Sequence, residues 1–181
     1  MHNLGELSYV VLDVPEPQAR SVTAIRRAHG DLFRAALPVE VTLTDSLDPE
    51  QDPEEAFAAL DALAAVAIPI ETSFAGAHRF PGSDTFVMRL AADEPFVTLR
   101  DRIVGTGIKF EPPSGYDFVP HCTLRTRSPV NPEEAEQLLR TDISGQMTLD
   151  TLSVYTLTRA STPAGVACRL RHRVRLAGQR S

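Results

Sequence analysis

The chain has 181 residues, 43% of them hydrophobic, which suits one domain or two closely joined lobes with a real core. Its net charge of −6 argues against broad binding to long duplex nucleic acid, which requires a basic surface. No apolar run approaches the roughly 18–20 residues needed to span a membrane, and no secretory signal opens the chain, so we expect a cytoplasmic protein with no membrane partner.

The first third of the chain carries alternating strand and helix signals. Residues 7–14 predict a strand, and apolar residues recur at helical spacing over 17–28. A second strand is predicted over 39–44. The run Asp52-Pro53-Glu54-Glu55 combines an N-cap, a proline at the first helical position and acids in the first turn. It predicts a helix that continues to about Ala67.

The middle of the chain predicts two strands, over 68–74 and 86–90, with residues 76–80 as a loop between them. A helix follows over 94–104, with apolar residues on its inner face. Near the C-terminus, Asn131-Pro132-Glu133-Glu134 repeats the helix-start pattern of residues 52–55 and predicts a helix to about Arg140.

The final quarter predicts two long strands, 147–158 and 165–176. In the second, four arginines alternate and would line one face: Arg169, Arg171, Arg173 and Arg175. We favour an edge strand guarded by charge against aggregation over a phosphate-binding track. The mixture of helices and hairpins along the chain indicates an α+β fold, with two mostly antiparallel sheets and helices outside.

The most informative stretch is residues 118–127, Phe-Val-Pro-His-Cys-Thr-Leu-Arg-Thr-Arg. Side chains alternate along a strand, so one face would carry His121, Thr123, Arg125 and Arg127. An imidazole, a hydroxyl and guanidinium groups together can bind and transform a phosphate ester. The alternative is an ordinary strand with a solvated polar face.

Residues 37–44, Leu-Pro-Val-Glu-Val-Thr-Leu-Thr, echo this stretch 81 positions earlier, counted from Glu40 to His121. Both contain a polar residue, an apolar residue, threonine and leucine in that order, and in both a proline comes shortly before them. With its two related motifs the chain resembles the two-histidine phosphoesterase superfamily, the 2′-5′ RNA ligase and cyclic phosphodiesterase-like proteins. The second motif, His121-Cys122-Thr123-Leu124, matches the family pattern, whereas the first has Glu40 in place of histidine.

The resemblance implies a single bilobal domain over residues 1–181, with two pseudo-symmetric lobes of antiparallel sheet flanking a central cleft. It implies an acid/base role for His121 and phosphate-binding roles for Thr123 and Thr42, without a metal or cofactor. Glu40 inherits the position of the other catalytic histidine. Arg125, on the face of His121, is expected to bind the anion, and Tyr116 is expected either to stack on a base or to pack.

Glu40 creates a chemical problem. An ionised glutamate could act as a general base, leaving a protonated His121 as the general acid. About 4 Å from a phosphate oxygen, however, it would repel that oxygen by roughly 4 kcal/mol at an effective dielectric of 20. Protonation of Glu40, or pairing with His121 or an arginine, would remove this cost.

The remaining candidates are weaker. His78 in the predicted loop is expected to be exposed, and His172 to face the core side of its strand. No Cys/His spacing suits a metal, and Cys122 and Cys168 are expected to be reduced thiols. Lys109 is the only lysine among 18 basic residues, and arginine is the better bidentate phosphate ligand.

Two possible functional classes follow from the resemblance, and a third possibility does not depend on it. In the first, the chain is an enzyme with weak or altered activity that opens 2′,3′-cyclic phosphates or acts on 2′-5′ linkages in an RNA terminus or small nucleotide. In the second, it is a catalytically inactive descendant that binds a nucleotide or partner in the cleft. In the third, the similarity between residues 37–44 and 118–127 is coincidental, and the chain is an α+β protein with an unrelated role. We expect a monomer.

Overall fold

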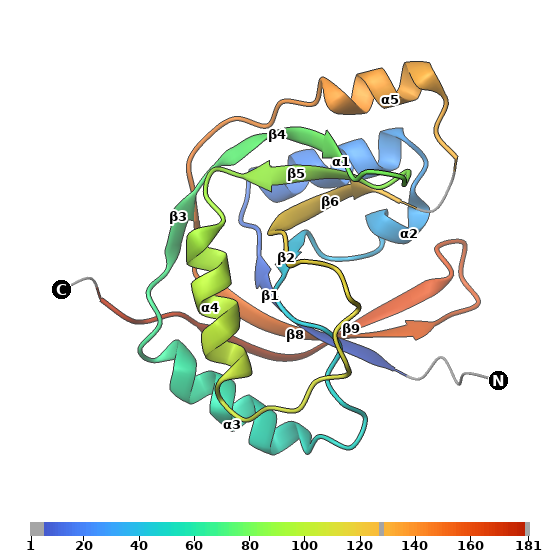
Figure 1. The fold of residues 1–181 in the computed structure, drawn as a ribbon. Coiled ribbons are helices and arrows are strands. Elements are labelled where there is room, and N and C mark those ends of the chain that lie inside the picture. The colour runs from blue at the N-terminus through green and yellow to red at the C-terminus, as the bar shows by residue number, and fades with distance from the viewer. Residues whose placement is uncertain (1–5, 127–128, 180–181) are drawn as a thin grey trace.

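Three antiparallel sheets and five helices make up residues 6–126 and 129–179, the part of the chain that this computed structural model describes (Figure 1). The elements, in chain order, are β1 (Leu7–Asp13), α1 (Gln18–Ala28), α2 (Leu32–Ala35), β2 (Glu40–Thr42), α3 (Pro53–Ala64), β3 (Ile70–Thr72), β4 (Phe74–Arg79), β5 (Phe86–Leu90), α4 (Glu94–Val104), β6 (His121–Arg125), α5 (Pro132–Leu139), β7 (Met147–Leu149), β8 (Thr151–Arg159) and β9 (Val166–Arg175). None of these helices is long and apolar enough to cross a membrane.

The expected α+β class is confirmed. One sheet has the strand order β2-β1-β8-β9, another β4-β5-β6, and β3 pairs with β7 in a small two-stranded sheet. The two motif strands, β2 and β6, each lie at the edge of their sheet, and they contact one another. Segments 81 residues apart are therefore brought together at the junction of the two larger sheets.

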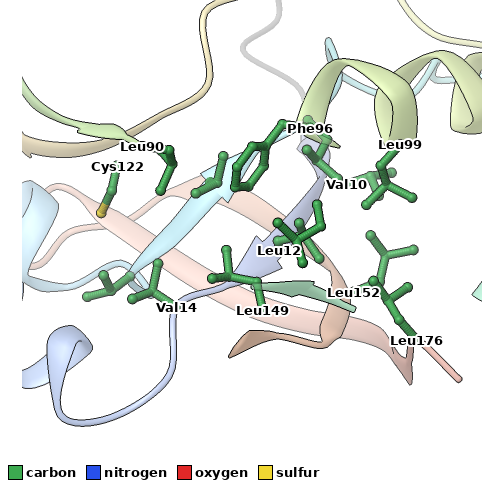
Figure 2. Packing of buried hydrophobic residues seen from close by; sticks show 14 of the residues in the cluster. Val10, Leu12, Val14, Leu90, Phe96, Leu99, Cys122, Leu149, Leu152 and Leu176 are labelled. Atoms are coloured by element: carbon green, nitrogen blue, oxygen red, sulfur yellow. The ribbon is translucent and has the colours of Figure 1, made fainter. Parts of the chain in front are cut away.

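The four-stranded sheet has one apolar face and one face that is open to a pocket. Val10 pairs with Val154 and Leu12 with Leu152, and these side chains join the core. Figure 2 shows this core, where residues of β1 and β8 meet Leu90, Phe96 and Cys122 from the rest of the chain. Side chains alternate along β1 and β2, so Tyr9, Val11, Glu40 and Thr42 lie on the opposite face.

The structure corrects two predicted boundaries. Residues 76–80 were expected to form a loop, but Phe74–Arg79 is strand β4; Gly76 has φ of 110° and lies in a register shift of the ladder with β5. The glycine marks a β-bulge, which a strand tolerates because glycine adopts positive φ at little cost. The strand expected over 147–158 is split at Asp150, since β7 pairs with β3 while β8 pairs with β1 and β9.

The arginines of β9 do not line one face, contrary to the sequence pattern. The register between β8 and β9 shifts between Val154 and Tyr155. Arg171 accordingly shares a groove with Val154 on the core side, whereas Arg173 bonds to the hydroxyl of Tyr155 on the pocket side. One inserted residue reverses the alternation, as a bulge does in any strand.

His172 lies on the core side of β9, as expected. Its ring stacks on Phe57 of α3 with centroids 4.6 Å apart, and its Nε2 lies 2.7 Å from a carboxylate oxygen of Asp61. This contact fixes α3 against the end strand of the sheet, so His172 serves packing rather than the pocket.

A buried arginine joins the two motif strands. Arg26 in α1 is only 1% exposed. Its Nε and Nη2 donate to the carbonyl of Thr123 in β6, at 3.1 and 2.7 Å, while Nη1 lies 3.1 to 3.3 Å from the carbonyls of Arg34, Leu37 and Pro38. One guanidinium thereby satisfies the free edge of β6 and the segment that leads into β2.

Replacement of Arg26 should strongly destabilise the protein. Arg26→Met leaves these carbonyls without their donor inside the protein, so we expect a loss of at least about 3 kcal/mol in the free energy of unfolding, measured by urea denaturation. Arg27→Met, at an exposed position of the same helix, is the matched control and should change stability by less than about 0.5 kcal/mol. Equal effects of the two substitutions would show that the Arg26 bonds contribute little.

Candidate functional site

The principal candidate site is a pocket of about 420 Å³ on the open face of the four-stranded sheet. The sheet contributes Leu7, Tyr9, Val11, Glu40, Thr42, Tyr155 and Leu157, and the segment that contains α2 contributes Phe33, Arg34, Leu37 and Pro38. The last residue of β8, Arg159, and the first residue of β9, Val166, line one end of the pocket. The size and the mixture of aromatic, apolar and a few charged groups are typical of a small-molecule site.

Glu40 and Thr42 both line this pocket, two positions apart on the same face of β2. The Thr42 hydroxyl donates to Oε2 of Glu40 at 2.9 Å. Burial raises the pKa of the Glu40 carboxyl above its ordinary value, although the Thr42 hydrogen bond and the charge of Arg34 oppose the rise. Glu40 is therefore more readily protonated than an exposed glutamate, and in this arrangement Thr42 directs its proton towards Glu40.

His121 begins β6 and is held in a defined orientation. Its Nδ1 lies 2.6 Å from the carbonyl of Val119, and the edge of its ring meets Phe80 with centroids 4.9 Å apart. A carbonyl can only accept, so Nδ1 carries the hydrogen and the lone pair of the neutral ring is on Nε2. Burial lowers the pKa of His121, and the charges of Arg34 and Arg89 lower it further, against the Val119 hydrogen bond.

These shifts favour the reverse of the roles suggested by ordinary pKa values. An ionised glutamate base and a protonated histidine acid were one possibility from the sequence. Burial instead favours neutral forms of both side chains, and a neutral imidazole with its lone pair on Nε2 is a base. A neutral His121 can accept a proton at Nε2, and a protonated Glu40 can donate one.

Glu40 and His121 lie on adjoining strands, but only Glu40 lines the pocket of 420 Å³. Arg34 connects them electrostatically, because it lines the pocket and its charge acts on both groups. The prediction that the two side chains converge across one groove remains a prediction.

The other predicted residues differ in their surroundings. Thr123 is buried in β6. Arg125 is also buried, and its Nε lies 2.6 Å from the carboxylate of Glu134 in α5, so its charge is compensated there. Tyr116 is 87% exposed, which rules out the packing role considered for it, and it does not line the pocket. Arg127 lies outside the described residues.

Sequence reasoning missed Arg34 and Arg89. Arg34 is in a helix of only four residues, too short to give a periodic signal, and Arg89 is directly opposite His121 in the β5–β6 ladder. The register of a sheet cannot be read from one strand, so Arg89 had no sequence signal. His78 is exposed in β4, as expected of its side chain though not of its backbone.

The structure also shows the state of the two cysteines and whether side chains are grouped to hold a metal ion. Cys122 and Cys168 are both free, and burial raises the pKa of Cys122 to about 11, which disfavours its thiolate at neutral pH. Within residues 6–126 and 129–179, no group of three or more His, Cys, Asp or Glu side chains is placed to hold a metal ion.

The state of His121 can be measured by NMR titration of its imidazole. We expect a pKa below 6.5, because burial and two cations disfavour the charged ring. Arg34→Gln should raise this pKa, since it removes one of the cations, whereas Arg27→Gln on the exposed face of α1 should not change it. A His121 pKa above 6.5 in the wild-type protein would contradict the assignment of His121 as a neutral base.

A sequence profile of the 2′-5′ RNA ligase superfamily matches residues 14–160, and comparison with curated protein sequences gave no match. The fold is similar to the crystal structure of TT0787 of Thermus thermophilus, with a TM-score of 0.67, 17% identity, and coverage of 96% of this chain and 100% of that chain. E. coli LigT complexed with 3′-AMP gives a TM-score of 0.63 at 16% identity, covering 94% of this chain and 98% of that chain. Such identities establish a shared fold, and the profile match establishes the family: the chain belongs to the 2′-5′ RNA ligase superfamily of two-histidine phosphoesterases.

Proposed function

We propose that this protein is a metal-independent phosphoesterase that opens 2′,3′-cyclic phosphates at an RNA terminus or in a small nucleotide. The observation that carries the proposal is the state of His121, an imidazole fixed by Val119 with its lone pair on Nε2 and its pKa lowered. In a chain of this superfamily, such a group is suited to general-base catalysis near neutral pH.

In the proposed reaction, His121 Nε2 accepts a proton from the attacking water. The water oxygen forms a bond to phosphorus while one ribose–oxygen ester bond breaks. The departing ribose oxygen takes a proton from Glu40. The products are a phosphate monoester, a protonated His121 and an ionised Glu40, and transfer of that proton back through solvent restores the starting state.

Thr123 and Thr42 are proposed to contact the phosphate oxygens, as the family motif implies. For Thr42 this requires a change of partner, because its hydroxyl donates to Glu40 in the structure. A substrate phosphate that accepts this hydrogen bond would remove a group that favours ionised Glu40. Phosphate binding would then raise the pKa of Glu40 further and favour its role as the acid.

The pocket and the similar structures support a nucleotide ligand. A volume of about 420 Å³ is in the range of pockets for small organic molecules. E. coli LigT has been crystallised with 3′-AMP, with NADP⁺ and with ATP. We propose an RNA terminus or small nucleotide as the ligand here, in the cytoplasm, and hydrolysis as the reaction.

A second candidate is a non-catalytic nucleotide-binding protein. One observation favours it: the carboxyl at the position of the family's first histidine is bonded to the threonine of its own motif. The first motif would then be satisfied internally, and the pocket would bind without reaction.

The leaving group distinguishes the two catalytic roles. Glu40→Gln should lower hydrolysis of a 2′,3′-cyclic nucleotide by about 100-fold, the scale of general acid catalysis. On a diester with a nitrophenyl leaving group, which departs without a proton, the same variant should lose less than about 10-fold. His121→Ala should lose about 100-fold or more on both substrates. Equal losses for Glu40→Gln on both substrates would show that Glu40 is not the acid.

Glu40→His tests whether the wild-type protein is an enzyme or a binder. The substitution restores the histidine pair of the family and removes a carboxyl group that repels the phosphate whenever it is ionised. We expect hydrolysis of the cyclic nucleotide at pH 7 to rise by roughly tenfold or more. Activity that is present only in Glu40→His would identify the natural protein as a binder. If the variant is slower than an active wild type, glutamate serves a reaction different from that of the family.

A further inference from the structure

With Glu40 in place of histidine, the first motif has no side chain that can carry a positive charge to the phosphate, so another residue has to supply one. The candidates are the arginines near the motif strands. Arg125 is paired with Glu134 of α5 at 2.6 Å, and Arg173 is paired with Asp13 at 3.0 Å. Both guanidiniums are held by these carboxylates. Neither Arg125 nor Arg173 lines the pocket that contains Glu40.

Two arginines do line the pocket, Arg34 and Arg159. In the strand register, Asp13 at one end of β1 lies opposite Glu40 of β2, and Leu7 at the other end lies opposite Leu157 of β8. Arg159 lies two residues beyond Leu157, so it is at the end of the pocket remote from Glu40. Arg34 is near Glu40, since its charge contributes to the pKa of that carboxyl.

Arg34 is also held firmly with respect to the strand of His121. The side chain of Asp31, which caps α2, accepts from the Arg34 N–H at 2.9 Å and from the Thr126 N–H at 2.7 Å. Arg34 Nε donates to the Thr126 hydroxyl at 3.2 Å, and its carbonyl accepts from Arg26 at 3.1 Å. Backbone and side chain are thus both fixed to the C-terminal end of β6, at Thr126, five residues beyond His121.

We propose that Arg34 is the residue that binds the substrate phosphate between Glu40 and His121, and that it supplies the positive charge that the altered first motif lacks. A guanidinium is suited to this task because it presents paired donors to two phosphate oxygens. Its charge also favours the neutral form of His121, which the base requires. This inference rests on the proposed function, since it assigns a ligand to the phosphate of that substrate.

The test is binding measured by calorimetry, with adenosine 2′,3′-cyclic phosphate and adenosine as probes. Arg34→Gln should weaken binding of the cyclic nucleotide by about tenfold or more and leave adenosine binding unchanged. Arg34→Lys keeps the charge but not the paired donors, so its affinity should be intermediate. Arg27→Gln removes an exposed arginine outside the pocket and is the matched control, with no expected change. Thermal unfolding of each variant establishes that α2 remains folded, and Arg34→Lys carries the test if Arg34→Gln unfolds.

The outcomes separate this inference from the proposed reaction. If the wild type hydrolyses the cyclic nucleotide but its affinity is unaffected by Arg34→Gln, the role of Arg34 is overturned and the reaction stands. If the wild type binds the cyclic nucleotide without hydrolysing it, and Arg34→Gln weakens that binding, Arg34 is the phosphate ligand of a binding protein. An equal loss of affinity for adenosine would show that Arg34 only maintains the shape of the pocket.

Discussion

The arrangement of the site depends on the burial of one charged side chain, Arg26. Its guanidinium is almost completely removed from water and is surrounded by backbone carbonyls. Removing a charge from water is costly unless hydrogen bonds replace its hydration. Because the carbonyls come from β6 and from the segment before β2, this requirement fixes the two motif strands relative to each other. The junction of the sheets is thus specified by a polar interaction rather than by apolar packing alone.

The same junction sets the protonation states of the site. Stability associated with His121 is fully present above its ordinary pKa of about 6.5 and is lost as the pH falls through its lowered value. Stability associated with Glu40 is present below its ordinary value near 4.5 and is lost as the pH rises through its raised value. Near neutral pH, His121 therefore does not lower the free energy of unfolding, whereas any ionisation of Glu40 does lower it. Arg34 and the hydroxyl of Thr42 reduce this effect.

Sequence reasoning predicted those features that depend on local periodicity or on paired motifs. The starts of α3 and α5 were marked by Asp52 and Asn131, whose side chains do cap these helices. The echo between residues 37–44 and 118–127 anticipated two strands that meet in space. Register, in contrast, depends on the partner strand, so the bulges at Gly76 and between Val154 and Tyr155 were not predicted.

Among the arginines, the sequence favoured Arg125 because side-chain alternation places it on the same strand face as His121. Alternation does not show, however, which charges are compensated by a nearby carboxylate. Glu134 is nine residues further along the chain and reaches Arg125 only because α5 folds back onto that sheet. Neither Arg26 nor Arg34 belongs to a sequence motif that marks it out. Their roles arise from carbonyls and carboxyls that are distant in sequence. The amino-acid sequence shows which side chains have the chemistry to bind a phosphate, whereas the fold determines which of them line the pocket.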